Sequence, residues 1–252
     1  MMPVNKSTSW GPVADWYKDV VQGEGSYQRD LILPNLSRMM GVKRGERVLD
    51  LACGEGFMSR EWSASGAEVT GIDISPELIA IAKKASPKMD FRVSSADDLR
   101  SLDDLSFDKA AMVLAVQNME NVQGVFKECS RVIRPGGSFY MVINHPCFRV
   151  PKNSSWGFDD AMKVQYRRID RYLSETKVAI DMHPGEKKKE TTASFHRPLQ
   201  YYFKLLSKAG LCVSRLEEWN SGKKSQPGPR AAMEDRARKE IPLFMAIECG
   251  KK

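Results

Sequence analysis

The sequence predicts an α/β protein whose core is a doubly wound, mostly parallel sheet. Along the middle of the chain, short apolar runs alternate with segments in which apolar residues recur at helical spacing, the order typical of strand–helix–strand units. An apolar run at 48–51 leads into a glycine-containing turn at 52–56, and a further apolar run at 69–73 ends in an acid. A strand, a glycine turn, a helix, a strand and a terminal acid form a βαβ unit suited to hold a nucleoside.

Seven strands are expected in this sheet. They are short and dense in apolar residues, as in a parallel sheet that helices cover on both faces. Two of them follow the last predicted helix and close the sheet. The predicted ranges are 46–51, 67–73, 89–93, 108–114, 137–144, 211–219 and 241–249.

The helices between these strands are predicted from capping residues and apolar stripes. Ser75-Pro76 supplies an N-cap followed by proline at the first helical position. Later, a single apolar stripe is followed by Pro135 and two glycines, which end the helix. The predicted helices are 56–65, 76–86, 121–133 and a segment that starts near Leu199 and ends at Gly210.

Other segments stand outside this alternation. The stretch 9–41 is expected to be helical in two pieces that break at 23–25, and 221–240 is expected to be a polar loop. A long polar segment after the fifth strand, with a strand or hairpin expected over 163–181, is predicted to lie over the carboxyl ends of the strands, where α/β sheets bind ligands. The expected division is an N-terminal helical cap at 1–40, a core at 41–145 and 196–252, and a lid or substrate insertion at 146–195.

Composition narrows the class of protein. The 252 residues are 42% hydrophobic and 28% charged, which is ordinary for one large soluble domain with insertions. The five cysteines form no CxxC pair, so we expect a reducing cytoplasm and neither a disulfide framework nor a metal site. No apolar run approaches the roughly 18 residues of a membrane helix, and no membrane partner is expected. The net charge of +7 is not gathered on one predicted element, which makes nucleic acid an unlikely partner.

The residues of the glycine turn indicate which nucleoside binds. The dinucleotide fingerprint G-x-G-x-x-G requires a small third position, where this chain has Phe57. An acid at Asp50 also opposes a pyrophosphate, which prefers backbone N–H groups. S-adenosylmethionine carries a sulfonium and an ammonium group and no phosphate. Acidic side chains around a pocket therefore favour the binding of this cationic cofactor.

Four motifs, in the expected order, resemble those of class I S-adenosylmethionine-dependent methyltransferases. Residues 48–56 resemble the family's glycine-rich first motif, and 71–75 resemble its second-strand motif. Phe107-Asp108 opens the fourth strand, and 131–137 resemble the R-x-L-x-P-G-G run before the fifth. The resemblance covers roughly 40–145 by motif. It implies a Rossmann-like, seven-stranded sheet whose last strand is antiparallel, with S-adenosyl-L-methionine as the cofactor.

The resemblance also implies a set of cofactor contacts. Asp73 would hold the ribose, and the backbone N–H of Ala96 would contact the adenine. Two positions depart from the family: Ala52 stands where the first motif usually begins with glycine, and Ser95 stands where an acid often contacts the adenine amino group. That contact is expected from Ser95, from Asp97 or from neither. The expected cofactor-binding residues are Asp50, Ala52, Cys53, Gly54, Gly56, Asp73, Ile74, Ser95, Ala96, Asp97 and Leu114.

His145 is the candidate catalytic residue, because it follows the predicted fifth strand at a point that in this fold faces the transferred methyl group. A neutral imidazole there could take a proton from the acceptor or orient it. The alternative is a histidine that anchors the insertion by hydrogen bonds. The residues expected to contact the substrate are Tyr17, Gln117, Asn118, His145 and His196.

The sequence therefore predicts transfer of a methyl group from S-adenosylmethionine to a small-molecule acceptor by in-line displacement. Such a reaction depends mainly on alignment and on exclusion of water, so the lack of a Ser-His-Asp or metal constellation in the sequence is compatible with it. An RNA or protein methyltransferase is the alternative enzyme, in keeping with the positive charge. A nucleoside-binding sensor or an inactive partner is the alternative that catalyses nothing.

Overall fold

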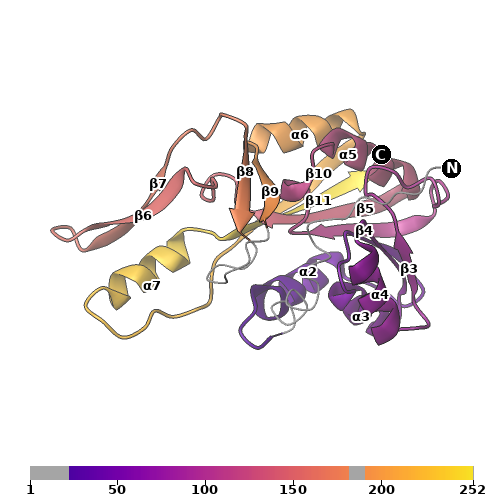
Figure 1. Cartoon of the computed structure of the whole chain (residues 1–252), viewed down its shortest axis with the longest axis horizontal. Coiled ribbons are helices and arrows are strands. Elements are labelled where there is room, and N and C mark those ends of the chain that lie inside the picture. Colours follow the sequence, from indigo (N-terminus) through magenta and orange to yellow (C-terminus); the bar gives the residue numbers. More distant parts are fainter. Residues whose placement is uncertain (1–22, 182–190, 252) are drawn as a thin grey trace.

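A seven-stranded sheet forms the centre of the computed structural model, which describes residues 23–181 and 191–251 (Figure 1). Its strands are β1 (Arg47–Leu51), β2 (Glu68–Asp73), β3 (Asp90–Val93), β4 (Phe107–Val113), β5 (Ile133–Asn144), β10 (Leu211–Trp219) and β11 (Phe244–Lys251). They lie in the order β10-β11-β5-β4-β1-β2-β3. β11 is antiparallel to both of its neighbours, and the other pairs of this sheet are parallel. The predicted doubly wound fold with an antiparallel last strand is confirmed.

Helices cover both faces of the sheet (Figure 1). The π-helical turn η2 (Gln28–Ile32), α2 (Leu33–Met40), α3 (Phe57–Ala64) and α4 (Pro76–Ala85) lie on one face. On the other lie α5 (Val122–Val132) and α6 (Leu199–Lys208), and the 3-10 turn η3 (Val116–Asn118) follows β4. No helix in the described part of the chain has both the length and the apolar composition needed to span a lipid bilayer.

Each face buries its own apolar core. Between α5 and the sheet, the rings of Phe126 and Phe139 meet edge to face with their centroids 5.9 Å apart, and both side chains are fully buried. On the opposite face, Leu36 and Trp62 are buried against the sheet. Because helices cover both faces, the central strands are apolar on both sides, which is why they read as short continuous apolar runs.

The predicted N-cap of α4 is confirmed, whereas Pro135 and the two glycines after it lie within β5 instead of ending α5, which already ends at Val132. Ser75 caps α4 by accepting a 3.3 Å hydrogen bond from the N–H of Leu78, with Pro76 in the first turn. Asn121 caps α5 by accepting a 3.0 Å hydrogen bond from the N–H of Gly124. The second helical piece of the predicted 9–41 segment ends at Met40, and its first piece lies outside the described residues. β5 begins earlier than predicted, at Ile133, which pairs with β4.

The insertion after β5 forms two antiparallel hairpins; the predicted range 163–181 does contain strands, but the alternative of a hairpin within that range is wrong. One hairpin joins β6 (Ser154–Asp159) to β7 (Val164–Ile169), and the other joins β8 (Thr176–Asp181) to β9 (Thr191–His196). β7 and β8 both fall within the predicted 163–181 hairpin, yet each pairs with a strand outside it. The prediction rested on alternation within 163–181, whereas the partners of β7 and β8 are the flanking strands β6 and β9, which were not predicted.

The predicted polar loop at 221–240 was also wrong in part, because it contains the helix α7 (Ala231–Glu240). Only Met233 and Ala237 of this helix are buried, so its apolar periodicity is weak. Its residues are mostly strong helix formers, and this intrinsic preference explains a helix that periodicity did not reveal. α7 packs beside β7, and both extend away from the central sheet (Figure 1).

Candidate functional site

The turn between β1 and α3 follows the end of a central strand. Ala52, Gly54 and Gly56 all adopt the left-handed backbone conformation, with φ of 57°, 57° and 82°. A Cβ on Gly56 would lie 2.8 Å from Cζ of Phe91, so that position also requires glycine for space. At Ala52 the same backbone conformation carries a methyl group. This explains why the related first motif usually has glycine there.

A pocket opens beside this turn, at the carboxyl ends of β1 and β4. Five predicted cofactor residues line it, namely Asp50, Ala52, Cys53, Gly54 and Leu114. The sequence did not single out the other lining residues, which are Gln28, Glu55, Phe57, Met58 and Val113. Most of these flank a motif and could have been found as neighbours of it. Gln28 comes from η2, and no sequence signal marks it.

Asp50 lies on the buried side of this pocket. Its Oδ2 accepts a 2.5 Å hydrogen bond from Oγ of Ser59, and its side chain is buried. Burial raises the pKa of Asp50 to about 7, the Ser59 hydrogen bond opposes this rise, and the nearby Asp73 and Glu55 carboxylates add to it. The acid is therefore poised between its neutral and charged forms near neutral pH.

Asp73, at the end of β2, holds the glycine turn in place. Its Oδ2 accepts a 2.9 Å hydrogen bond from the N–H of Gly54, and its Oδ1 accepts a 2.8 Å bond from the N–H of Ser75. Burial raises the pKa of Asp73, and these backbone donors lower it. Each carboxylate oxygen can accept a further hydrogen bond. Ile74 follows with 41% of its side chain exposed, an apolar surface beside the turn.

Two acids, Asp50 and Glu55, line the pocket, and Asp73 lies near Asp50 without lining the pocket itself. Glu55 forms a 2.7 Å ion pair with Arg60. Within the described residues, neither Asp50 nor Asp73 forms an ion pair. Burial, followed by the charges of Asp50 and Asp73, raises the pKa of the Cys53 thiol, so this cysteine stays protonated in the turn. A cationic ligand complements such a pocket better than an anionic one.

The loop after β3 carries the predicted adenine contacts. Oγ of Ser95 donates a hydrogen bond to Asp97, which also accepts a 2.8 Å bond from Nδ2 of Asn121 at the start of α5. Ala96 between them is buried. Ser95 and Asp97 therefore hold one another, and the loop presents a fixed backbone.

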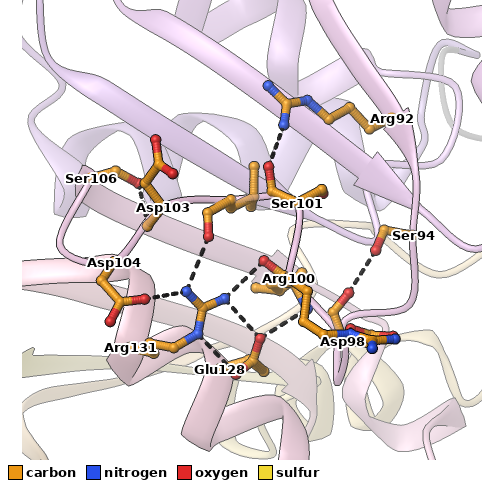
Figure 2. Close-up of polar contacts among 12 residues, drawn as sticks. Arg92, Ser94, Asp98, Arg100, Ser101, Asp103, Asp104, Ser106, Glu128 and Arg131 are labelled. Atoms are coloured by element: carbon orange, nitrogen blue, oxygen red, sulfur yellow. Dashed lines mark hydrogen bonds and ion pairs between the residues drawn. The ribbon is translucent and has the colours of Figure 1, made fainter.

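Arg131 fastens the continuation of this loop to α5 (Figure 2). It donates 2.8 and 3.0 Å hydrogen bonds to the carbonyls of Leu99 and Leu102. It also forms a two-point contact with Glu128, with distances of 3.0 and 2.8 Å, and a 2.5 Å ion pair with Asp104. The rigid, planar guanidinium carries five N–H donors, which allows Arg131 to form all of these bonds at once. The arginine that opens the 131–137 motif thus holds the loop after β3 against α5.

The turn after β4 carries Gln117, which does not itself line the pocket but follows Leu114, which does. Leu114 has a φ of 52°, and its carbonyl accepts a 2.9 Å hydrogen bond from Nε2 of Gln117. Oε1 of Gln117 is buried and has no partner among the described residues. Asn118 instead donates a 2.8 Å bond to the carbonyl of Ala193, which ties this turn to β9 rather than to the pocket.

His145, at the end of β5, has both ring nitrogens engaged. Its Nε2 lies 2.6 Å from Oε1 of Glu218, and its Nδ1 accepts a 3.2 Å hydrogen bond from the N–H of Cys147. This arrangement places the proton on Nε2. Burial lowers the pKa of His145, although Glu218 opposes the shift. The geometry favours the anchoring alternative, and a role as base stays a prediction.

Two other predicted substrate residues lie elsewhere. His196 is buried, and its Nε2 lies 2.7 Å from the carbonyl of Tyr172 within the insertion. It does not line the pocket. Tyr17 lies outside the described residues.

Comparisons with known proteins agree with this geometry. A family model described as a methyltransferase domain matches residues 49–141. A solved structure of an S-adenosylmethionine dependent methyltransferase from Mesorhizobium loti superposes with a TM-score of 0.69 and 26% identity, covering 86% of this chain and 96% of that one. Residues 49–141 therefore carry a methyltransferase domain, in a chain that has the fold of an S-adenosylmethionine dependent methyltransferase.

Curated relatives match part of the chain. A demethylmenaquinone methyltransferase of Tropheryma whipplei is 38% identical over 113 residues, which is 43% of this chain and 46% of that protein. A ubiquinone biosynthesis O-methyltransferase of Xanthomonas oryzae pv. oryzae is 34% identical over 101 residues, which is 38% of this chain and 42% of that protein. The match thus spans less than half the length of these relatives.

Proposed function

We propose that this chain transfers a methyl group from S-adenosylmethionine to a small-molecule acceptor. The observation that carries the proposal is the pair of buried carboxylates, Asp50 and Asp73, beside a glycine turn. Neither forms an ion pair with a described residue. Their charge suits a cofactor that bears a sulfonium and an ammonium group, and opposes a dinucleotide. The names of the relatives, a demethylmenaquinone methyltransferase and a ubiquinone biosynthesis O-methyltransferase, support a small-molecule acceptor.

Individual residues suit different parts of this cofactor. Asp50 would bind the cationic amino-acid end, and the turn at Gly54 and Gly56 allows close approach of the backbone. Asp73 has acceptor capacity for the ribose hydroxyls beyond the two bonds it accepts from the turn. Ile74 offers an exposed apolar face for the adenine ring, and the Ala96 backbone would bind its edge. When bound, the cofactor supplies a methyl group on a positively charged sulfur.

The rest of the reaction requires the chain to align the acceptor and to exclude water. We propose that the acceptor enters beside Gln28 and Gln117, below the insertion. Gln117 has a buried amide oxygen available as an acceptor. His145 would act by anchoring the insertion to Glu218, because both of its nitrogens are already engaged.

The test is transfer of a tritiated methyl group from S-adenosylmethionine to three sets of acceptors: phenols and hydroquinones, total RNA, and protein. Label in the small-molecule set, lost in an Asp73→Asn variant, is the expected result. Label in RNA or protein alone would support the alternative enzyme classes. Cofactor binding without label in any set would support a sensor or an inactive partner.

A further inference from the structure

Two arginines and a tryptophan form a cluster on the inner face of the β6–β7 hairpin. Trp156 of β6 is directly opposite Arg167 of β7, so the two side chains share one face. Both are partly buried, whereas Ser155 and Arg168 on the other face are exposed. Arg149, from the segment that leads into the hairpin, reaches the same ring. The guanidinium carbons of Arg167 and Arg149 lie 5.1 and 6.0 Å from the centre of the Trp156 ring.

Neither cluster arginine has a carboxylate partner among the described residues. Arg167 donates only to neutral oxygens, with bonds of 2.9 Å to the carbonyl of Phe148 and 2.6 Å to Oγ of Ser154. Nε of Arg149 is buried and has no partner there. By contrast, the neighbouring Arg168 forms a 2.9 Å ion pair with Asp170.

The two positive charges are unfavourable where they lie. Burial lowers the pKa of both Arg149 and Arg167, and the charge of Arg167 lowers the pKa of Arg149 further. Partly buried like charges of this kind are costly unless a counter-charge is supplied. Stacking on Trp156 offsets only part of that cost. An anion bound between the two guanidinium groups would supply this counter-charge.

The cluster adjoins the proposed acceptor entrance. The N–H of Arg149 donates a 2.8 Å hydrogen bond to the carbonyl of His145 at the end of β5, next to the strand that lines the pocket. Arg149 also lies close enough to Tyr27 for the Tyr27 hydroxyl to affect its pKa. Tyr27 directly precedes Gln28, which lines the pocket.

We propose that Arg149 and Arg167 bind an oxyanion, a carboxylate or a phosphate, of the small-molecule acceptor. This inference rests on the proposed function, because it assigns the acceptor's charge. The fork of donors on each guanidinium matches the paired oxygens of such groups. The acid-lined pocket receives the cationic cofactor, and the arginine cluster receives the anionic acceptor. Opposite charges in the two subsites keep each ligand in its own place.

The experiment uses the full chain saturated with S-adenosylhomocysteine. It is titrated by calorimetry with inorganic phosphate, with benzoate and with benzyl alcohol as the neutral analogue of benzoate. Arg149→Gln and Arg167→Gln are compared with Arg168→Gln, a matched control that removes the same charge from the opposite face of β7. Phosphate or benzoate should bind at least tenfold more tightly than benzyl alcohol. Each cluster variant should weaken that binding about tenfold or more, and the control should stay within about twofold.

Several outcomes would overturn the proposal. One is that neither phosphate nor benzoate binds to the wild-type chain. Another is that the cluster variants and Arg168→Gln lose equal affinity for the anion. S-adenosylhomocysteine binding should be unchanged in all variants; its absence from the wild type would instead refute the proposed function. If Arg149→Gln fails to fold, Arg167→Gln decides, because its side chain lies on a hairpin outside the central sheet. Whether phosphate or benzoate binds more tightly distinguishes the two oxyanions.

Discussion

Oγ of Ser59 donates a 2.5 Å hydrogen bond to Oδ2 of Asp50. This bond joins the helix α3 to the central strand β1 beside the pocket. It is the only side-chain hydrogen bond to Asp50 among the described residues. The hydroxyl and backbone N–H of Ser59 are neutral donors that do not compensate a buried carboxylate, so burial raises the pKa of Asp50 to about 7. A bound cation would supply the missing compensation. Cofactor binding and the ionisation of Asp50 are therefore expected to be linked.

The first prediction concerns the pH dependence of cofactor affinity. A cationic cofactor favours ionised Asp50, so the affinity for S-adenosylmethionine should fall by about tenfold as pH is lowered from 7.5 to 5.5. Asp50→Asn should bind more weakly at pH 7.5 and should lose most of this pH dependence. Calorimetry at several pH values checks both. An unchanged pH dependence in Asp50→Asn would refute the linkage.

The second prediction concerns the ligand-free chain. The pKa of Asp50 is about 7 in the folded chain and about 3.9 in an unfolded one. Its contribution to stability is therefore fully present below the unfolded value and is lost as pH rises to the folded value. Asp50→Asn removes this loss. The unfolding free energy of the variant minus that of the wild type should therefore rise by about 2 kcal/mol from pH 5 to pH 8. Denaturant titrations of both proteins measure the difference, and a gain that does not depend on pH would contradict it.

The third prediction concerns Ala52, whose φ of 57° is disfavoured for a residue with a Cβ. Ala52→Gly should raise the unfolding free energy by about 0.5 kcal/mol, the balance of relieved strain and greater freedom of the unfolded chain. Ala232→Gly is the control, because Ala232 is exposed on α7, and it should lower the unfolding free energy by about 0.5–1 kcal/mol. Equal destabilisation by both substitutions would show that Ala52 is unstrained.

The fourth prediction concerns Arg131 and the loop that it holds (Figure 2). Arg131→Lys removes the two-point contact with Glu128 and at least one bond to a loop carbonyl. It should cost about 2 kcal/mol of unfolding free energy. It should also weaken cofactor binding, because the loop carries Ala96. Arg100→Lys is the control, since Arg100 is 88% exposed in its ion pair with Asp98, and it should change neither quantity measurably. Equal unfolding free energies and equal cofactor affinities of Arg131→Lys and Arg100→Lys would show that Arg131 does not support the loop.

The fifth prediction separates anchoring from catalysis at His145. Burial holds the pKa of His145 below its ordinary value. Its stabilising contribution is thus present above about pH 6.5 and is lost as pH falls through its folded pKa. His145→Asn should lower stability at pH 8 and reduce the loss of stability between pH 7 and pH 5. A variant with unchanged stability and cofactor affinity, but with turnover reduced more than about a hundredfold, would identify His145 as a base.

The strands of the central sheet were predictable because each is determined by residues that are close together in the sequence. Asp50 is the penultimate residue of β1 and Asp73 is the last residue of β2, and the glycines that follow Asp50 leave few alternatives for the turn. The pairing of β6 with β7 depended on contacts between segments that carry weak periodicity, so it was not predictable in the same way. The helix α7 was missed because its signal is intrinsic propensity rather than an apolar stripe.

The candidate site was predictable to the same extent. The motif residues around Gly54 converge on the pocket, because a strand end and a turn place them there. Gln28 arrives from a separate helical turn, and only the folded chain brings it to the pocket. The ring nitrogens of His145 are occupied by Glu218 and Cys147, and Glu218 lies far along the sequence on β10. Spacing in the sequence cannot reveal such partners.

The central claim is that the pocket beside Asp50 binds S-adenosylmethionine. Titration calorimetry of the full chain with S-adenosylmethionine, and separately with NAD, tests it most directly. The expected result is a saturable heat of binding with one site for S-adenosylmethionine and no heat of binding for NAD. Heat with NAD, or none with S-adenosylmethionine at millimolar concentration, would contradict it.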